Sequence, residues 1–327
     1  MTAARESVLT CGIALCTCNG MAYLDEQLHS LLTQKRPADR LVISDDASDD
    51  GTWEYLQEWA AQAAISVDLR RNRRRQGVVR NFETAIRALE TDLIFLCDQD
   101  DVWLQRKIEV IAEVFESSPD VLLVHTDARL VDGKAKDLGV SLLQALGLTQ
   151  SERDRIARGD AFSVLCRRNV VTGATTAFRR ALLDTALPFP LSSLHDEWLG
   201  AIAAATGRVV LLDVPTVKYR QHGGNVAGMP PPSAWRSVRR ITALSGDFQT
   251  RRAAHAAVLF ERLQAASGVL PGALQMTQDA LAHARMRSAL PGGLMARIRA
   301  VLRELRTGRY GRFSNGFAGA MRDILNR

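Results

Sequence analysis

Short apolar runs alternate with helical patterns through about the first 130 residues, and this alternation narrows the folds open to the chain. Each run has the length and near-continuous apolarity of a buried strand. The runs cover residues 8–17, 40–44, 65–70, 93–97 and 121–127. The first interval between them places four leucines on one helical face: Leu24, Leu28, Leu31 and Leu32. Alternation on this scale predicts an α/β fold with a mostly parallel sheet flanked by helices.

Polar side chains follow three of the predicted strands at the point where each strand ends. They are Thr17 and Asn19 after the first strand, Asp45 and Asp46 after the second, and Asp98, Asp100 and Asp101 after the fourth. Ligands of open sheets bind beyond the carboxyl ends of the strands. We therefore expect these side chains to gather along one edge of the sheet and to form a ligand site. For Asp45 and Asp46 the alternative is a local turn that caps the next helix.

Three carboxylates crowd into residues 98–101, directly between an apolar run and the pair Val102-Trp103. Carboxylates this close repel one another, so a cluster without a positive partner costs stability. Asp98 and Asp100 offer hard oxygen atoms of the kind that Mg²⁺ and Mn²⁺ bind alongside phosphates. The pattern favours a divalent cation here over a solvated acidic loop.

Three further segments carry candidate site residues. The segment "RNRRRQGVVRNF" (71–82) surrounds Gly77 with arginines, which fits either a diphosphate cradle or a solvated basic turn. The segment "LHDEWLG" (194–200) sets Asp196 and Glu197 at the start of a predicted helix, where the dipole keeps a general base ionised; acidic helix caps look the same. The segment "YRQHGGN" (219–225) presents His222 in a glycine-rich bend, as a structural residue or as a third metal ligand.

The C-terminal part of the chain differs in composition from the rest. From residue 230 onward it contains 16 Arg, no Lys and five acidic residues, and the proline-rich segment "GMPPPS" (228–233) predicts a stiff linker at its start. We therefore divide the chain into a domain at 1–229 and a basic helical region at 230–327. Residues 294–306 form an amphipathic helix that suits an anionic membrane surface, or else packing on the first domain or in a homodimer.

The overall composition, 46% apolar and 24% charged, is that of a soluble globular protein, and no stretch is long and apolar enough to span a bilayer. The five cysteines are odd in number and lie mostly within apolar runs, which is typical of reduced thiols in the cytoplasm. Together with the lack of an export signal, this predicts a cytoplasmic protein, in the membrane alternative one peripheral on the inner face of the membrane.

Seven segments in order closely resemble family-2 glycosyltransferases of the GT-A fold, and among them the bacterial rhamnosyltransferases that build O-antigen and other surface polysaccharides. The segments are "ALCTCNG", "VISDDASDDGT", "RNRRRQGVVRNF", "FLCDQDDVW", "VTGATTAF", "LHDEW" and "YRQHGGN". The resemblance runs from about residue 10 to residue 226. It implies an inverting transfer of a sugar, L-rhamnose from dTDP-rhamnose in that branch, to a lipid-linked or saccharide acceptor.

The resemblance also implies a role for each matching residue. Thr17, Asn19, Asp45 and Asp46 would bind the base and ribose of the nucleotide-sugar, with Gly77 and Asn81 close to the nucleotide. Asp98 and Asp100 would hold Mn²⁺ or Mg²⁺ on the diphosphate, with His222 completing the shell. Asp196 stands at the position of the catalytic base. Glu197 intervenes before the family's aromatic residue, so two adjacent carboxylates remain candidates for the base.

Two other functions share some of these features. A nucleotidyltransferase that makes sugar nucleotides has a similar sheet and metal site, but it needs a glycine-rich, basic phosphate loop after the first strand. The segment "CTCNGMAYL" has one glycine and no basic residue there. A nucleic-acid-binding module would use the arginine-rich region, yet it leaves the carboxylates unexplained and lacks interleaved aromatic residues. We therefore expect no nucleic-acid partner.

Overall fold

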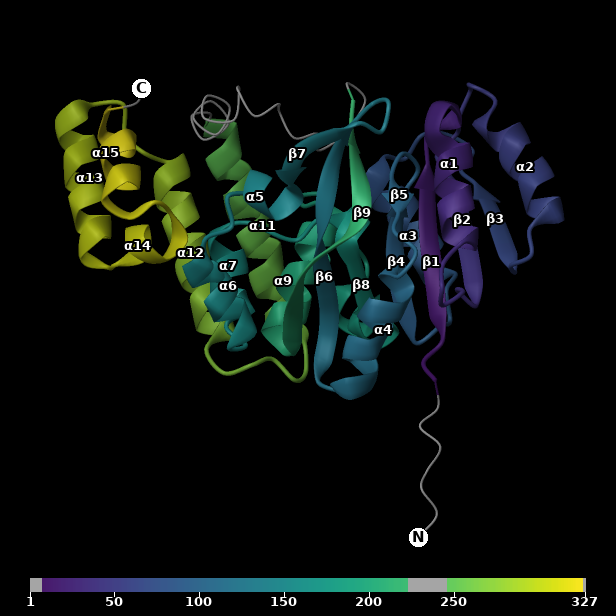
Figure 1. Cartoon of the computed structure of the whole chain (residues 1–327). Coiled ribbons are helices and arrows are strands. Elements are labelled where there is room, and N and C mark those ends of the chain that lie inside the picture. Colours follow the sequence, from purple (N-terminus) through teal and green to yellow (C-terminus); the bar gives the residue numbers. More distant parts are fainter. Residues whose placement is uncertain (1–7, 223–245, 326–327) are drawn as a thin grey trace, which may run out of the picture.

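The structure of the chain, a computed structural model, describes residues 8–222 and 246–325 (Figure 1). Within these residues nine strands form one sheet in the order β3-β2-β1-β4-β8-β6-β9-β5, with β7 paired to β6. The first four strands are parallel: β1 (Cys11–Thr17) lies between β2 (Arg40–Asp45) and β4 (Leu93–Asp98), and β3 (Val67–Arg71) pairs with β2. These four strands confirm the first four of the five predicted runs, and their carboxyl ends share one edge.

The second half of the sheet mixes strand directions. There β8 (Thr176–Arg179) runs antiparallel to both β4 and β6 (Val121–Asp132), while β6 runs parallel to β9 (Arg208–Gln221). Two short strands complete it, β5 (Val102–Trp103) against β9 and β7 (Asp137–Ser141) against β6. Neither was predicted, because two residues carry no periodicity and β7 is largely exposed. The antiparallel strand β5 directly follows the acidic segment 98–101, and its pairing with β9 fixes the end of this segment to the sheet.

Helices cover both faces of the sheet, as the sequence predicts. One face packs against α1 (Met21–Leu32), α2 (Thr52–Gln62) and α4 (Lys107–Ser117). The other packs against α3 (Val78–Arg87), α7 (Ala161–Arg167) and α9 (His195–Thr206). Three short helices, α5 (Leu142–Ala145), α6 (Gln150–Ala157) and α8 (Leu183–Ala186), connect these elements. On α1 the leucines at 24, 28 and 31 are buried, but Leu32 is exposed.

The C-terminal helices continue outward from α9. Here α11 (Gly246–Ala265) packs beside α12 (Ala273–Ser288), and Leu259 and Leu263 of α11 join the core on the α9 face. The basic region therefore shares apolar core with the first 222 residues. The predicted boundary between residues 229 and 230 lies outside the described residues and stays a prediction.

The last helices are α13 (Leu294–Arg306), α14 (Arg309–Phe313) and α15 (Gly316–Leu325). They form the end of the molecule farthest from β3 and α2 (Figure 1). The range of α13 matches the predicted amphipathic helix, but its apolar stripe divides: Val301 packs inside, while Leu294 and Leu302 are exposed. No helix in the described ranges combines the length and apolarity needed to cross a bilayer.

Candidate active site

A cavity of about 270 Å³ opens where β1, β2 and β4 end. Thr17, Asp46 and Asp98 line it from these three strand ends, and Asn81 lines it from α3. Asp100 and Asp196 complete the set of predicted residues in its wall. The other four, Asn19, Asp45, Gly77 and His222, do not line this cavity. Hydrogen bonds connect three of them to residues that do: Asp45 to Thr17, Gly77 to Asp46 and His222 to Asp100. The parallel register explains the gathering, since Thr17 of β1 lies beside Asp45 of β2 while Cys16 lies beside Asp98 of β4.

The side of the cavity formed by β1, β2 and α3 is held by buried hydrogen bonds. We call it the nucleotide half, because the sequence resemblance implies that the base and ribose of a nucleotide bind there. Asp45 is fully buried and accepts from the Thr17 hydroxyl at 2.9 Å and from the Ser48 amide at 3.0 Å. Asp46 accepts from the Asn72 amide and from the backbone N–H groups of Gln76 and Gly77, each at 2.8 Å. Asp46 thereby fixes the arginine-rich segment to the end of β2.

Asn81, Gly77 and Asn19 serve the same framework. The Asn81 side chain donates to the Ser44 carbonyl at 2.8 Å and accepts from the Ser44 hydroxyl at 2.7 Å, tying α3 to β2. Gly77 has φ +85° just before α3, a conformation that favours glycine, and its N–H points at Asp46. Asn19 exchanges hydrogen bonds with Asp49 and so joins the loops after β1 and β2.

The opposite side of the cavity, the carboxylate half below, is built from acids that face one another. Burial, followed by the charges of Asp100 and Asp196, raises the pKa of Asp98 to about 7. Burial and the charges of Asp100 and Asp98 likewise raise the pKa of Asp101, whose Oδ2 is buried and has no hydrogen-bond partner among the described residues. Part of each shift comes from neighbouring carboxylates, so the acids of this half repel one another when they are ionised.

Two side chains of basic residue types lie beside these acids. His222 places Nε2 2.7 Å from Oδ2 of Asp100 and stacks on the ring of Tyr23 at 4.7 Å. Lys107 is fully buried beneath the cluster, donates to the Ala174 carbonyl at 2.5 Å and lies over the Trp103 ring. Burial lowers the pKa of Lys107 to about 7, so it is a weak counter-charge at neutral pH. Sequence reasoning missed Lys107, because a lysine in an amphipathic helix normally predicts a solvent-exposed position.

Whether the carboxylate half can hold a divalent cation depends on the donor atoms that its side chains present. In the described ranges no three His, Cys, Asp or Glu side chains already form a metal-binding group. The oxygen donors of Asp98 and Asp100 and the excess negative charge around them nevertheless suit Mg²⁺ or Mn²⁺. Such ions commonly take only one or two protein carboxylates when phosphate oxygens supply other ligands, so the residues present fit the ion.

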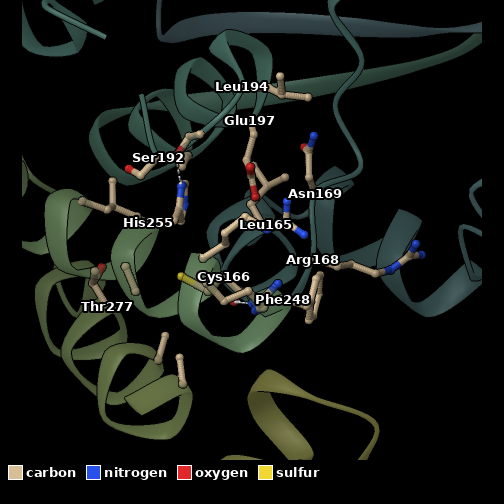
Figure 2. A pocket seen from close by; sticks show the side chains of 18 of the residues that line it. Leu165, Cys166, Arg168, Asn169, Ser192, Leu194, Glu197, Phe248, His255 and Thr277 are labelled. Atoms are coloured by element: carbon tan, nitrogen blue, oxygen red, sulfur yellow. Dashed lines mark hydrogen bonds between the residues drawn. The ribbon is translucent and has the colours of Figure 1, made fainter. Parts of the chain in front are cut away.

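The first turn of α9 separates the two candidates for the base. The carboxylate of Asp196 lines the cavity and is held by two backbone N–H groups, those of Gly173 at 2.8 Å and Glu197 at 2.7 Å. Glu197 lies outside this cavity and lines a second pocket between α9 and α11 (Figure 2). Adjacent residues point apart because they lie about 100° apart around a helix, a direction that sequence alone did not decide.

His195 is a further cavity residue to which sequence reasoning gave no role. Its ring is almost fully buried and stacks on Phe82 with centroids 3.9 Å apart. Burial lowers its pKa, so the imidazole is neutral at pH 7. A Cβ at Gly173 would lie 3.1 Å from His195 Nε2, so the glycine lets this loop approach the start of α9.

Comparison with known proteins agrees with this architecture. The family described as "Glycosyl transferase family 2" matches residues 13–185, more than half of the chain. The chain belongs to glycosyl transferase family 2. This matched range contains every predicted site residue except Asp196 and His222.

Curated relatives in the family are distant in sequence. A glycosyltransferase of Nostoc sp. is 26% identical over 213 residues, which cover 63% of this chain and 63% of the relative. The dTDP-rhamnosyl transferase RfbG of Shigella flexneri is 26% identical over 227 residues, covering 65% of this chain and 73% of the relative. The abequosyltransferase RfbV of Salmonella typhimurium is 30% identical over 109 residues, a third of each chain.

Solved structures extend the likeness over nearly the whole fold. TarS 1-349 of S. aureus, crystallised with UDP-GlcNAc, has a TM-score of 0.60 at 16% identity, covering 97% of this chain and 88% of that one. The mannosyltransferase PcManGT of Pyrobaculum calidifontis, solved with GDP-Man and Mn²⁺, has a TM-score of 0.50 at 20% identity, covering 99% and 88%. The fold is therefore the GT-A fold of family-2 glycosyltransferases, as the sequence predicted.

Proposed function

We propose that the chain is an inverting, metal-dependent glycosyltransferase that moves a sugar from a nucleotide-sugar to a hydroxyl of an acceptor. The observation that carries this proposal is that one cavity joins two different halves. The nucleotide half is lined by hydrogen-bonded polar groups, and the carboxylate half is lined by acids that repel one another. A nucleoside diphosphate carries groups that match both, since its base and ribose form hydrogen bonds and its diphosphate binds cations. Relatives in the family are glycosyltransferases, which favours this function over nucleotidyl transfer.

In this proposal six residues of the nucleotide half bind or position the nucleotide: Thr17, Asn19, Asp45, Asp46, Gly77 and Asn81. Asp46 and Asn81 line the cavity and offer oxygen atoms to base N–H or ribose hydroxyl groups. Asp45, Gly77 and Asn19 act behind them by holding the loops. The solved neighbour structures with UDP-GlcNAc and with GDP-Man support a nucleotide-sugar ligand for this fold.

Asp98, Asp100 and His222 would hold the divalent cation of the donor complex. A bound cation there would stabilise the negative charge that grows on the departing diphosphate. The protein residues prepare that step in two ways. His222 orients the Asp100 carboxylate at 2.7 Å, and the buried Lys107 limits the repulsion within the cluster.

Asp196 is the proposed general base. Its carboxylate accepts the proton of the acceptor hydroxyl while the hydroxyl oxygen attacks the anomeric carbon. The bond from that carbon to the diphosphate oxygen breaks on the opposite face, its electron pair stays with the diphosphate, and the configuration inverts. The backbone N–H groups of Gly173 and Glu197 fix the position of the carboxylate for this proton transfer.

The donor proposed first is dTDP-L-rhamnose, with an O-antigen or similar surface polysaccharide as the product. RfbG supports this choice, although RfbV is named for a different sugar, so the family relationship alone leaves several sugars as candidates. The acceptor is a saccharide, free or carried on a polyprenyl lipid.

The arginine-rich end suits a lipid-carried acceptor and a peripheral position on the inner face of the cell membrane. Leu294, Met295 and Leu302 are exposed on α13 beside the exposed Arg299 and Arg303. Apolar and basic groups on one helix match an anionic lipid surface. A second copy of the chain is the alternative partner for this face. Co-sedimentation with vesicles of anionic and of neutral lipid decides between them, because only the membrane proposal predicts a preference for anionic vesicles.

A thermal-shift panel tests the function. It would compare dTDP-L-rhamnose, UDP-GlcNAc and GDP-mannose, each with Mn²⁺ and with EDTA. We expect one donor to raise the melting temperature by several degrees with Mn²⁺ and far less with EDTA, because binding to the folded state stabilises it. If no nucleotide-sugar of a wider set raised the melting temperature in a metal-dependent way, this result would contradict the proposal.

A further inference from the structure

A second pocket, of about 570 Å³, lies beside the active-site cavity between α7, α9, α11 and α12 (Figure 2). We call it the α11 pocket. Leu194 lines both it and the active-site cavity, and Asp196 and Glu197, consecutive in the first turn of α9, face one each. Its volume is typical of pockets that hold small organic ligands. The two cavities therefore adjoin at the start of α9, with Asp196 on the active-site side and Glu197 on the side of the α11 pocket.

Opposite charges face each other across the α11 pocket without touching. Figure 2 shows the side chain of Glu197 directed from α9 into the pocket. Arg252 of α11 acts on Glu197 electrostatically, yet in the described part of the chain this pair forms no ion pair within 4 Å; Arg252 instead donates to the Cys166 carbonyl at 2.8 Å. A half-buried carboxylate held apart from its counter-charge leaves acceptor sites for hydrogen-bond donors of a ligand.

Neutral polar groups and apolar walls surround these charges. His255 shares a hydrogen bond with the Ser193 hydroxyl, and burial together with the Arg252 charge lowers its pKa to about 4, so the ring is neutral. The Ser192 hydroxyl is buried without a partner in the described structure. Phe248, from the first turns of α11, adds an aromatic wall.

These features select a class of ligand. A hydrocarbon would leave Glu197 and Ser192 buried without hydrogen bonds, which is costly. A phosphate would meet the Glu197 carboxylate, and two of the three arginines that line the pocket are already engaged, Arg168 with Glu152 and Arg252 with the Cys166 carbonyl. A saccharide offers hydroxyl donors to Glu197 and His255, accepts from Arg252, and presents apolar ring faces to Phe248.

We propose that the α11 pocket binds the saccharide acceptor, with Glu197 and His255 hydrogen-bonding its hydroxyl groups and α11 and α12 forming its outer wall. The inference rests on the proposed function, because a saccharide acceptor is needed only by a glycosyltransferase. It gives Glu197 an acceptor-binding role beside the proposed base, and it gives the C-terminal helices a part in acceptor choice.

The test uses the full chain and a panel of methyl glycosides of common hexoses, 6-deoxyhexoses and N-acetylhexosamines. Saturation-transfer NMR measures which of them bind. Ala280→Phe fills the pocket from α12, Glu197→Gln removes its carboxylate, and Gln278→Phe adds the same bulk on the exposed side of α12. We expect at least one glycoside to bind the wild type, a tenfold or greater loss of affinity in the first two variants, and no change in the third.

The outcomes separate this inference from the proposed function. Metal-dependent binding of a nucleotide-sugar tests the function alone, and Ala280→Phe should retain it, which also shows that the variant is folded. Equal glycoside affinity in the wild type and Ala280→Phe would overturn the inference. So would the failure of every glycoside to bind a wild-type protein that binds its donor. If the wild-type protein bound no nucleotide-sugar donor, that result would instead overturn the proposed function.

Discussion

The two halves of the active-site cavity satisfy their polar groups in opposite ways. In the nucleotide half, Asp45 and Asp46 together accept hydrogen bonds from hydroxyl, amide and backbone donors. In the carboxylate half, Asp98 and Asp101 have raised pKa values because acids face acids in a buried setting. The first half is complete without a ligand, whereas the second is complete only when positive charge arrives.

This difference separates positioning from charge stabilisation. Hydrogen bonds already made within the protein hold the nucleotide half in shape before the donor binds, so little ordering remains to be done. Uncompensated carboxylates instead lower stability and raise affinity for a cation. Changes in the carboxylate half should therefore impair chemistry and metal use, and changes in the nucleotide half should impair donor affinity.

The largest effect is expected for Asp196→Asn. An amide cannot take the acceptor proton, so transfer should fall by about 10³-fold. Donor affinity should stay within about twofold, as measured by calorimetry with Mn²⁺. Asparagine also loses one of the two backbone hydrogen bonds that Asp196 accepts, so the melting temperature is recorded alongside. Weak transfer with equally weak donor binding would contradict the role of base.

Asp100→Asn should have the next largest effect. Removing one negative charge weakens cation binding, and we expect a roughly 100-fold loss of transfer at limiting Mn²⁺ that excess Mn²⁺ partly restores. Without metal the same variant should melt at a higher temperature than the wild type, because it relieves the repulsion on Asp98. Unchanged metal dependence would break the contrast between the two halves.

Asp46→Asn tests the nucleotide half. Its carboxylate serves three N–H donors with two oxygen atoms, and asparagine leaves at least one of them unpaired, which costs on the order of 1–2 kcal/mol. Donor affinity should fall about tenfold, while the concentration of Mn²⁺ needed for half-maximal transfer stays the same. A shift in that concentration would show that the halves are not separate.

His125→Phe serves as a control for acid sensitivity outside the site. His125 is buried in β6, and burial lowers its pKa from 6.5 to about 4. Between these values the unfolded chain binds more protons than the folded one, so stability falls as the pH drops from 6.5 toward 4. At pH 5 the wild type should lose about 2 kcal/mol through this residue. Urea unfolding at pH 5 and 7.5 should show a smaller pH difference in His125→Phe; an equal difference would assign the acid sensitivity elsewhere.

The sequence predicted the parallel half of the fold and the convergence of its site residues. Continuous apolar runs mark buried parallel strands, and once strands are parallel their following residues must share an edge, which brought Thr17, Asp46 and Asp98 together. What depends on helix packing was not readable. The turn of α9 that separates Asp196 from Glu197, the burial of Lys107, and the docking of α11 on α9 arise from contacts between segments far apart in the chain.

The central claim is that the carboxylate half holds a cation only together with a diphosphate. Calorimetric titration of Mn²⁺ into protein saturated with UDP, dTDP or GDP, in the wild type and in Asp98→Asn/Asp100→Asn, tests it most directly. The account predicts one Mn²⁺ per wild-type chain with a suitable nucleotide, weak binding without it, and none in the double variant. Nucleotide binding that is equally tight in EDTA and in Mn²⁺ would contradict it.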